Sequence, residues 1–181
     1  MTFTEQQEHT ILNLAEWSIQ DFMESGKRRK LPATFMEDPS LQAKLGVFVS
    51  VYIRKELRGC IGTFAETDPL THNIREMAIQ AAFEDRRFKP IDNDELKDLK
   101  VEISVLSKRR RIYSPEEIEI GKHGIYLIHE IRRATLLPQV ATNNNFSPVE
   151  FLECCAKNKL GLHADSWKES DMFVYEAIII G

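Results

Sequence analysis

The sequence predicts an α+β fold with a mainly antiparallel sheet flanked by helices. Apolar residues recur at helical spacing near the N-terminus, and in several later segments they alternate with a period of two. These segments do not follow one another in the strict βαβ order that a doubly wound parallel sheet requires. Antiparallel pairing is therefore the better prediction.

The chain is expected to begin with a long amphipathic helix. Thr4 and Gln7 have the spacing of a capping box, and Gly26 is the expected end. The apolar positions at helical spacing are Ile11, Leu14, Ala15, Ile19, Phe22 and Met23. A basic linker at 27–30 then leads to Pro32.

Two strands and a second helix are predicted next. Residues 47–53 alternate between the two faces of a strand, and the polar stretch 54–56 predicts a hairpin return into a strand that contains Cys60. The following helix is expected to have Asp68 as its cap and Pro69 in its first turn. A charged segment, 84–89, comes after this helix and ends at Pro90.

The second half of the chain predicts further strands and one more long helix. Strands are expected at 101–105 and 172–180, with a hairpin formed by 125–128 and 135–137. Residues 114–117 predict a short helical start. Ser147 and Glu150 form a second capping box, which opens a helix that Gly161 ends.

Length and composition place the chain among ordinary globular proteins. Its 181 residues suit a single domain, 1–181, and 43% hydrophobic with 29% charged residues is typical of a soluble protein. The net charge of −4 argues against a dedicated nucleic-acid binder. Apolar runs fall short of the roughly 20 residues that span a bilayer, and the N-terminus lacks a secretory signal. We therefore expect a cytoplasmic protein whose three cysteines are reduced.

The segment LRGCIG at 57–62 is the strongest candidate for a site. In an extended strand, Arg58 and Cys60 would share one face while Leu57 and Ile61 face the core. Gly59 and Gly62 would let a ligand or another backbone approach the sulfur. A cation beside a thiol favours the thiolate, which is a nucleophile or a metal ligand. The alternative is a small buried cysteine with no chemical role.

Two acidic residues and an arginine are further candidates. Asp85 would supply a carboxylate and Arg87 an anion clamp beside Cys60, because the planar guanidinium suits that role. The alternative is an Asp85–Arg87 pair that stabilises its own loop. Glu102 lies on the polar face of its strand and faces either solvent or a cleft, where it would act as a general base or a metal ligand.

Pro138 and Gln139 form the last candidate. Proline cannot donate to a sheet ladder, so Pro138 is expected to end the strand at an edge or bulge and to present Gln139. An amide that both donates and accepts suits recognition of a polar ligand. The alternative is a structural turn.

Metal and nucleic-acid sites receive little support. The five histidines show no ligand spacing, and Cys154 and Cys155 project about 100° apart on a helix. No metal site is predicted, and the sequence identifies no cofactor. Basic clusters at 27–30, 109–111 and 132–133 would bind RNA only if they converged, and no aromatic RNA motif accompanies them.

Three motifs together resemble those of the AMMECR domain family, whose prokaryotic members are also called system protein A of the Ammecr–Memo–radical-SAM system. They are LRGCIG at 57–62, AAFEDRRFKP at 81–90 and LLPQVA at 136–141. Shorter matches at 46–49, 101–106, 120–124 and 164–168 extend the resemblance over nearly the whole chain. The chain departs from the family at Arg86, where proline is usual, and this departure predicts a less rigid loop.

The resemblance implies an α+β fold with a larger and a smaller lobe around one cleft, but no particular reaction. It also implies a Memo-like protein and a radical-SAM enzyme as partners. Three hypotheses follow: an enzyme or enzyme subunit with a small-molecule cleft around Cys60, an adaptor that docks those partners, or an RNA-binding protein. A glycine-flanked cysteine favours the first, since a docking surface has no special need for one.

Overall fold

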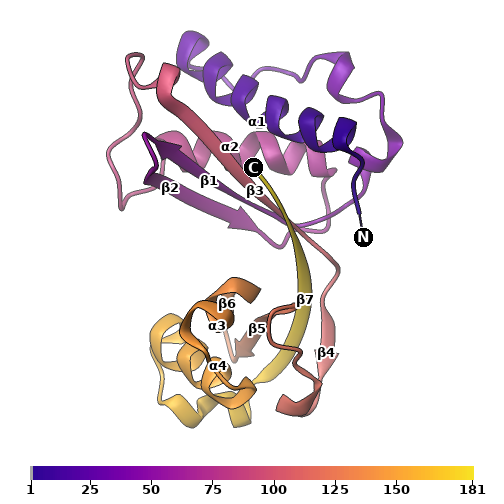
Figure 1. The fold of residues 1–181 in the computed structure, drawn as a ribbon, viewed down its shortest axis with the longest axis vertical. Coiled ribbons are helices and arrows are strands. Elements are labelled where there is room, and N and C mark those ends of the chain that lie inside the picture. The colour runs from indigo at the N-terminus through magenta and orange to yellow at the C-terminus, as the bar shows by residue number, and fades with distance from the viewer. Residues whose placement is uncertain (1) are drawn as a thin grey trace. The chain divides into compact units, whose positions relative to one another are not determined.

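The computed structural model describes residues 2–181 and divides them into two compact units (Figure 1). Unit 1 contains the described residues up to Leu106 together with Ile178–Gly181, and unit 2 is Ser107–Ala177. Each unit has helices and antiparallel strands, so the predicted α+β class is confirmed. That residues 1–181 form a single domain stays a prediction.

Unit 1 begins with the helix that the sequence predicted, α1 (Glu5–Ser25). The Thr4 side chain accepts from the backbone of Gln7, and the Gln7 side chain accepts from Thr4 N, so the capping box is complete. Gly26 ends the helix with φ 65°, a conformation that glycine adopts at little cost. The helix buries one apolar stripe, formed by Ile11, Leu14, Ala15 and Ile19.

Three antiparallel strands of unit 1 pair in the order β2–β1–β3, and the chain end at Gly181 lies beside β3 at Glu102. They are β1 (Val47–Ile53), β2 (Glu56–Thr63) and β3 (Leu99–Leu106). Every second residue of β1, from Val47 to Ile53, is buried in one core with α1 and α2. The two helices therefore cover one face of this sheet, as Figure 1 also shows, and Ser50 and Tyr52 belong to the other face.

A β-bulge interrupts the β1–β2 ladder beside the cysteine. Ile53 pairs with Glu56 and Tyr52 with Leu57, but Val51 then pairs with Gly59. Arg58 is the extra residue on β2 and has no partner of its own on β1. Leu57 consequently shares a face with Tyr52 and is 39% exposed, so the prediction that Leu57 faces the core was wrong.

The second helix of unit 1, α2 (Leu70–Phe83), packs on the sheet through its buried face. Its N-cap position is Pro69, and no side chain caps it, so the prediction of Asp68 as the cap was wrong. The Asp68 carboxylate instead accepts from the Thr67 hydroxyl at 2.9 Å. The helix ends at Phe83, and the charged loop follows as predicted.

Unit 2 has an antiparallel sheet in the order β4–β7–β5–β6. Its strands are β4 (Arg110–Ile112), β5 (His123–His129), β6 (Arg132–Leu136) and β7 (Asp171–Ile180), whose last residues belong to unit 1. The β5–β6 hairpin and β7 confirm the prediction. Three residues are too few to give a periodic signal, so β4 was not predicted.

Two helices follow the hairpin of unit 2. Strand β6 lies at the edge of this sheet and ends at Leu136, just before Pro138, as predicted. The same proline opens the helix α3 (Pro138–Asn144), which was not predicted. Proline fits the first turn of a helix because the missing N–H has no intrahelical acceptor there. The helix α4 (Pro148–Cys155) has the predicted Ser147–Glu150 capping box, and a π-helical turn continues it until Gly161, where φ is 69°.

Short 3₁₀ turns connect the remaining elements. They are Ala33–Phe35, Pro39–Gln42, Leu96–Asp98, Pro115–Glu117 and Ala164–Glu169. The turn at Leu96–Asp98 was not predicted from the sequence. The turn at Pro115–Glu117 is the short helical start predicted at 114–117. Within residues 2–181, no helix combines the length and the apolar character that crossing a membrane requires.

Candidate functional site

Cys60 lies at the end of a row of three polar side chains that crosses the sheet of unit 1. Cys60 pairs with Ser50 of β1, and Ser50 pairs with Glu102 of β3. The Ser50 hydroxyl donates to Cys60 Sγ at 3.4 Å. We call Cys60, Ser50 and Glu102 the Cys60 row; it lies on the face opposite α1 and α2, and each of its residues is partly exposed.

Aromatic residues flank the Cys60 row on the same strand. Tyr52 is two residues from Ser50, and its pKa is raised, first by partial burial and then by the negative charge of Glu102. On the other side, the Phe48 ring covers Gly62, where an added Cβ would lie 2.2 Å from the ring. The space at Gly62 is therefore filled by the protein itself and offers no opening for a ligand.

A buried carboxylate holds the cysteine backbone in place. Asp85, in the loop after α2, accepts from Cys60 N at 3.0 Å through Oδ2. Arg87 completes the arrangement, since its Nη2 donates to the Cys60 carbonyl at 2.8 Å and to Asp85 Oδ2 at 2.7 Å. Because β2 has a single neighbour in this sheet, these side chains satisfy backbone groups that would otherwise lie at an open edge.

Asp85 has a structural rather than a proton-transfer role in this geometry. Its side chain is 3% exposed, and Oδ1 also accepts from Arg87 Nε at 2.9 Å and from Arg87 N at 3.2 Å. The Arg87 guanidinium, followed by the backbone N–H groups, holds the pKa of Asp85 well below its usual range. A carboxylate with both oxygens engaged and a lowered pKa is a poor general base.

Gly59 is required by the close approach of α2. An added Cβ would lie 1.8 Å from the backbone oxygen of Ala81, and residue 59 is buried. The sequence predicted that another backbone or a ligand approaches this glycine, and the structure places the backbone of α2 there. Gly59 therefore sets the distance between helix and strand.

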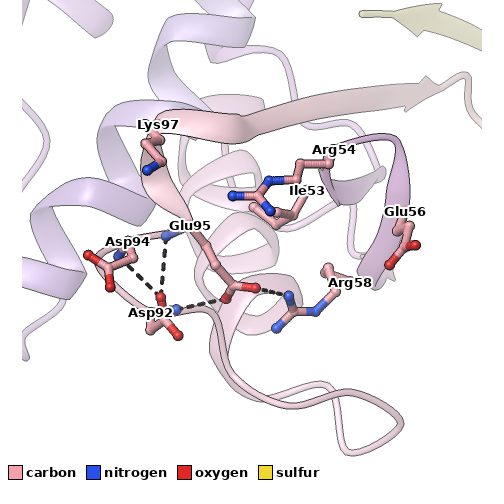
Figure 2. Close-up of a pocket in the computed structure, with 8 residues that line it drawn as sticks. All are labelled: Ile53, Arg54, Glu56, Arg58, Asp92, Asp94, Glu95 and Lys97. Atoms are coloured by element: carbon pink, nitrogen blue, oxygen red, sulfur yellow. Dashed lines mark hydrogen bonds and ion pairs between the residues drawn. The ribbon is translucent and has the colours of Figure 1, made fainter.

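Arg58 points into a charged pocket and has no contact with the sulfur of Cys60 among its described interactions (Figure 2). Its Nη1 donates to Glu95 Oε1 and its Nη2 to the Lys89 carbonyl. The pKa of Glu95 is lowered, chiefly by this bond to Arg58. That Arg58 and Cys60 share a face stays a prediction, because Arg58 is the bulged residue and has no partner on β1 that would define its face.

The charged pocket has a volume of about 600 Å³ and is lined by eight residues. They are Ile53, Arg54, Glu56, Arg58, Asp92, Asp94, Glu95 and Lys97. Much of this charge is neutralised within the protein, since Arg54 also pairs with Asp98 at 2.7 Å. The Asp92 carboxylate accepts from the backbone N–H groups of Asp94 and Glu95 (Figure 2).

The predicted site residues divide between the two units. Cys60, Asp85, Arg87 and Glu102 belong to unit 1, where the contacts above connect the first three directly. Pro138 and Gln139 belong to unit 2, in the first turn of α3. Pro138 is buried, and the buried Gln139 Oε1 accepts no hydrogen bond from the described residues.

Sequence reasoning missed Ser50 and Tyr52 as site residues. Both alternate with the valines of β1, so their position on the open face was predictable. Their alignment with Cys60 was not, because counting back from the hairpin turn without a bulge pairs Ser50 with Gly59. The bulge moves the partner of Ser50 by one residue, to Cys60.

Comparison with known proteins gives a consistent family signal. The AMMECR1 family model matches residues 12–180. A protein from Methanosarcina mazei is 33% identical over 97% of this chain and 92% of its own length. A protein from Methanopyrus kandleri is 39% identical over 92% of this chain and 84% of its own.

A solved structure has the same fold. The crystal structure of an uncharacterized protein from Pyrococcus horikoshii superposes with a TM-score of 0.88 at 30% sequence identity. The match covers 98% of this chain and 92% of that one.

Proposed function

This chain belongs to the AMMECR1 family, and from that premise we propose that it is a cysteine-dependent enzyme, or the catalytic part of one, that acts on a small electrophile. The observation that carries the proposal is the hydrogen bond from Ser50 Oγ to Cys60 Sγ within the Cys60 row. A structural cysteine in a packed core has no need of a polar donor, whereas a thiolate is stabilised by one. In this proposal Cys60 is the nucleophile.

Two neighbouring charges support this role. Glu102 is the side chain next to Ser50 across the β1–β3 ladder, and cross-strand neighbours have Cβ atoms about 5 Å apart. Glu102 therefore serves as the base that takes a proton from water during turnover. Arg87 is 62% exposed on its side chain and donates to the Cys60 carbonyl, so its positive charge lies at the edge of the site.

The proposed chemistry is acyl transfer through a thioester. The Cys60 thiolate attacks the carbonyl carbon of an ester or thioester, the carbon–heteroatom bond breaks, and the leaving group departs as an anion. Water then attacks the thioester, Glu102 accepts the water proton, and the carboxylic acid product leaves as the thiolate is regenerated. Both steps use only water and the substrate, so the sequence needs no further reagent.

The test uses p-nitrophenyl acetate with the purified full chain. We expect a burst of one equivalent of p-nitrophenolate, an acetyl group on Cys60 by mass spectrometry, and slower turnover. Cys60→Ala loses the burst, and Glu102→Gln keeps the burst but loses turnover. Ser50→Ala slows the burst about fivefold, as loss of a hydrogen bond of about 1 kcal/mol predicts.

Cys154→Ala is the matched control, because Cys154 is also a partly exposed free cysteine. This variant should behave as the wild type does. Acetylation of Cys60 no faster than that of Cys154 would contradict the nucleophile role. Equal turnover in Glu102→Gln and the wild type would remove Glu102 as the base.

A second candidate function is docking of a protein partner on the same face. Leu57 is 39% exposed beside Tyr52, and an apolar residue on an open sheet face suits a protein contact. The partners would be a Memo-like protein and a radical-SAM enzyme in the cytoplasm. Co-purification lost in Leu57→Asp but kept in Cys60→Ala would favour docking, and no binding at micromolar concentration would contradict it.

A further inference from the structure

We propose that a cavity between the segment after α1 and the first turns of α2 binds a small organic monocarboxylate with an apolar tail. The cavity belongs to unit 1 and has a volume of about 240 Å³. It is lined by Lys30, Leu31, Met36, Asp68, Pro69, Thr71, His72 and Arg75. This site shares no residue with the Cys60 row, so it is independent of the function proposed above.

One wall of the cavity is apolar. Leu31, Met36 and Pro69 line it, and Met36 is 44% exposed although it is a large hydrophobic residue. Binding pockets are commonly built from apolar side chains with a few polar groups that fix the orientation of the ligand. A short aliphatic tail would cover this wall.

The cationic group available to a ligand is Lys30. Of the two basic residues with a fixed charge that line the cavity, Arg75 pairs with Glu76 at 2.9 Å. No ion pair or hydrogen bond connects the Lys30 ammonium to another residue of the described chain, 2–181. A ligand carboxylate would give it a partner.

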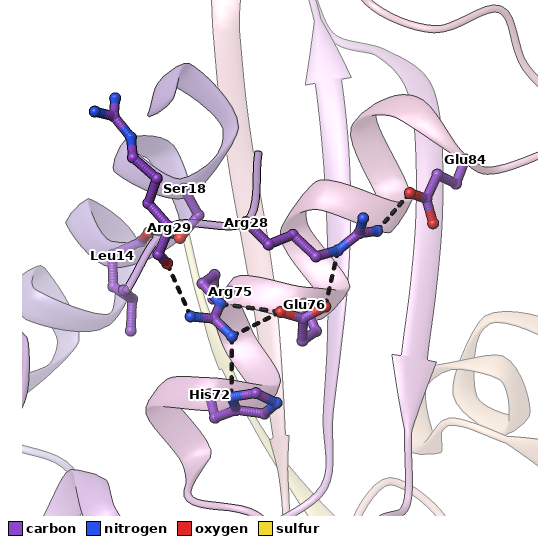
Figure 3. Close-up of polar contacts among 8 residues, drawn as sticks. All are labelled: Leu14, Ser18, Arg28, Arg29, His72, Arg75, Glu76 and Glu84. Carbon is purple, nitrogen blue, oxygen red and sulfur yellow. Dashed lines mark hydrogen bonds and ion pairs between the residues drawn. The ribbon is translucent and has the colours of Figure 1, made fainter. Parts of the chain in front are cut away.

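Arg75 holds the backbone of Arg29, the residue before Lys30 (Figure 3). Arg75 Nη1 donates to the Arg29 carbonyl at 3.0 Å, which fastens the basic segment to α2 next to the cavity. The Arg28 side chain adds a second attachment, to Glu76 and Glu84. Lys30 is therefore presented from a backbone that is held at two points.

His72 supplies a neutral donor. Arg75 Nη2 lies 3.1 Å from His72 Nδ1, and a guanidinium can only donate, so Nδ1 is the acceptor (Figure 3). The ring proton of neutral His72 is thereby placed on Nε2. The lining thus offers a carboxylate one ammonium, from Lys30, and one imidazole N–H, from His72.

The acidic residues Asp68 and Glu76 favour a ligand with one negative charge over a ligand with two. Asp68 lines the cavity, and Glu76 neutralises Arg75 from outside it. A dianion such as inorganic phosphate would meet repulsion from Asp68 with only Lys30 left to balance it. A monocarboxylate meets the same repulsion from Asp68 with a single charge, which the Lys30 ammonium balances one to one.

The test is a titration of the full, isotope-labelled chain with sodium hexanoate, followed by amide NMR at constant ionic strength. We expect saturable shifts confined to residues 30–36 and 68–75. Hexanol, which has the tail without the charge, and inorganic phosphate, which has the charge without the tail, should each bind more weakly than hexanoate.

Charge variants decide the assignment. Lys30→Met should weaken hexanoate binding about threefold, as expected for an exposed ion pair, and Asp68→Asn should strengthen it. Lys27→Met is the matched control, since Lys27 is an exposed lysine of the same segment outside the cavity lining, and it should leave binding unchanged. Thermal melting confirms that each variant is folded.

Three of the four results that would overturn the proposal concern the ligands and the lysine variants. They are the absence of saturable shifts up to the solubility of hexanoate, equal hexanoate affinity in Lys30→Met and Lys27→Met, and tighter binding of phosphate than of hexanoate. Unchanged or weaker binding in Asp68→Asn would also contradict it, because a like charge at the rim must oppose an anion.

Discussion

Asp85 Oδ2 accepts a hydrogen bond from Cys60 N at 3.0 Å, so a buried carboxylate in the loop after α2 fixes the β2 edge at the cysteine. The Arg87 guanidinium donates to both oxygens of that carboxylate and to the carbonyl oxygen of Cys60. At Cys60, Asp85 and Arg87 therefore bind the backbone N–H and C=O groups that a neighbouring strand would otherwise bind. The consequence is that the position of Cys60 depends on an ion pair from another part of the chain.

Replacement of Asp85 by asparagine should destabilise the protein. The change removes a charge that accepts four hydrogen bonds, and bonds to a charged group contribute about 1.5–3 kcal/mol. We expect the free energy of unfolding in urea to fall by about 2 kcal/mol. The control is Asp94→Asn, whose side chain pairs with no described residue and which should stay within about 0.5 kcal/mol of the wild type. Equal stabilities of the two variants would contradict the role of Asp85.

The contribution of Asp85 should depend on pH in a defined direction. Arg87 and the Cys60 N–H lower the pKa of Asp85 in the folded state, whereas the unfolded value is about 3.9. The stabilisation is then fully present above about pH 4 and is lost as pH falls toward the folded value. Urea unfolding of the wild type and Asp85→Asn should give a constant difference from about pH 7 to 5 and a smaller one near pH 3. A difference that stays constant down to pH 3 would show that Asp85 stabilises the fold by other means.

The two glycines around Cys60 should differ in their tolerance of alanine. At Gly59 the added methyl group meets the backbone of α2 at 1.8 Å, and a backbone cannot rotate away. We expect Gly59→Ala to cost about 3 kcal/mol or more and Gly62→Ala about 1 kcal/mol, the range seen for overpacked sites. The three atoms nearest to the methyl group at Gly62 all belong to the Phe48 ring, so Phe48→Leu should recover much of the loss in Gly62→Ala. Similar losses at the two sites would disprove this distinction.

Arg58 should leave the reactivity of Cys60 almost unchanged. Its guanidinium is held by Glu95 and the Lys89 carbonyl in the charged pocket, whereas Arg87 contacts the Cys60 backbone. We therefore expect Arg58→Ala to change the alkylation rate of Cys60 by iodoacetamide less than about twofold, because Glu95 balances its charge and salt screens what remains. Arg87→Ala should change it more. A larger effect of Arg58→Ala than of Arg87→Ala would restore the arrangement expected from the sequence.

The local elements of the fold were predictable because their signals lie within short stretches of sequence. Both capping boxes and both terminating glycines, Gly26 and Gly161, act on the backbone a few residues away. Alternation likewise identified β1, β3 and the β5–β6 hairpin. The helix α3 was missed because proline fits a strand end and the start of a helix equally well, and the residues after it decide whether a helix forms.

The sequence alone determined the α+β class, the family, and the presence of a glycine-flanked cysteine on a hairpin strand. Only the tertiary structure decided which cation and which polar groups surround that cysteine. A single bulged residue, Arg58, reverses the faces of a strand, because side chains alternate with a period of two. The shift pairs Cys60 with Ser50, and the Arg58 guanidinium binds Glu95. Neither the composition nor the spacing of the motifs reveals this one-residue shift in register. In the structure, β2 at this point contacts α2 through Gly59 and Asp85 through Cys60.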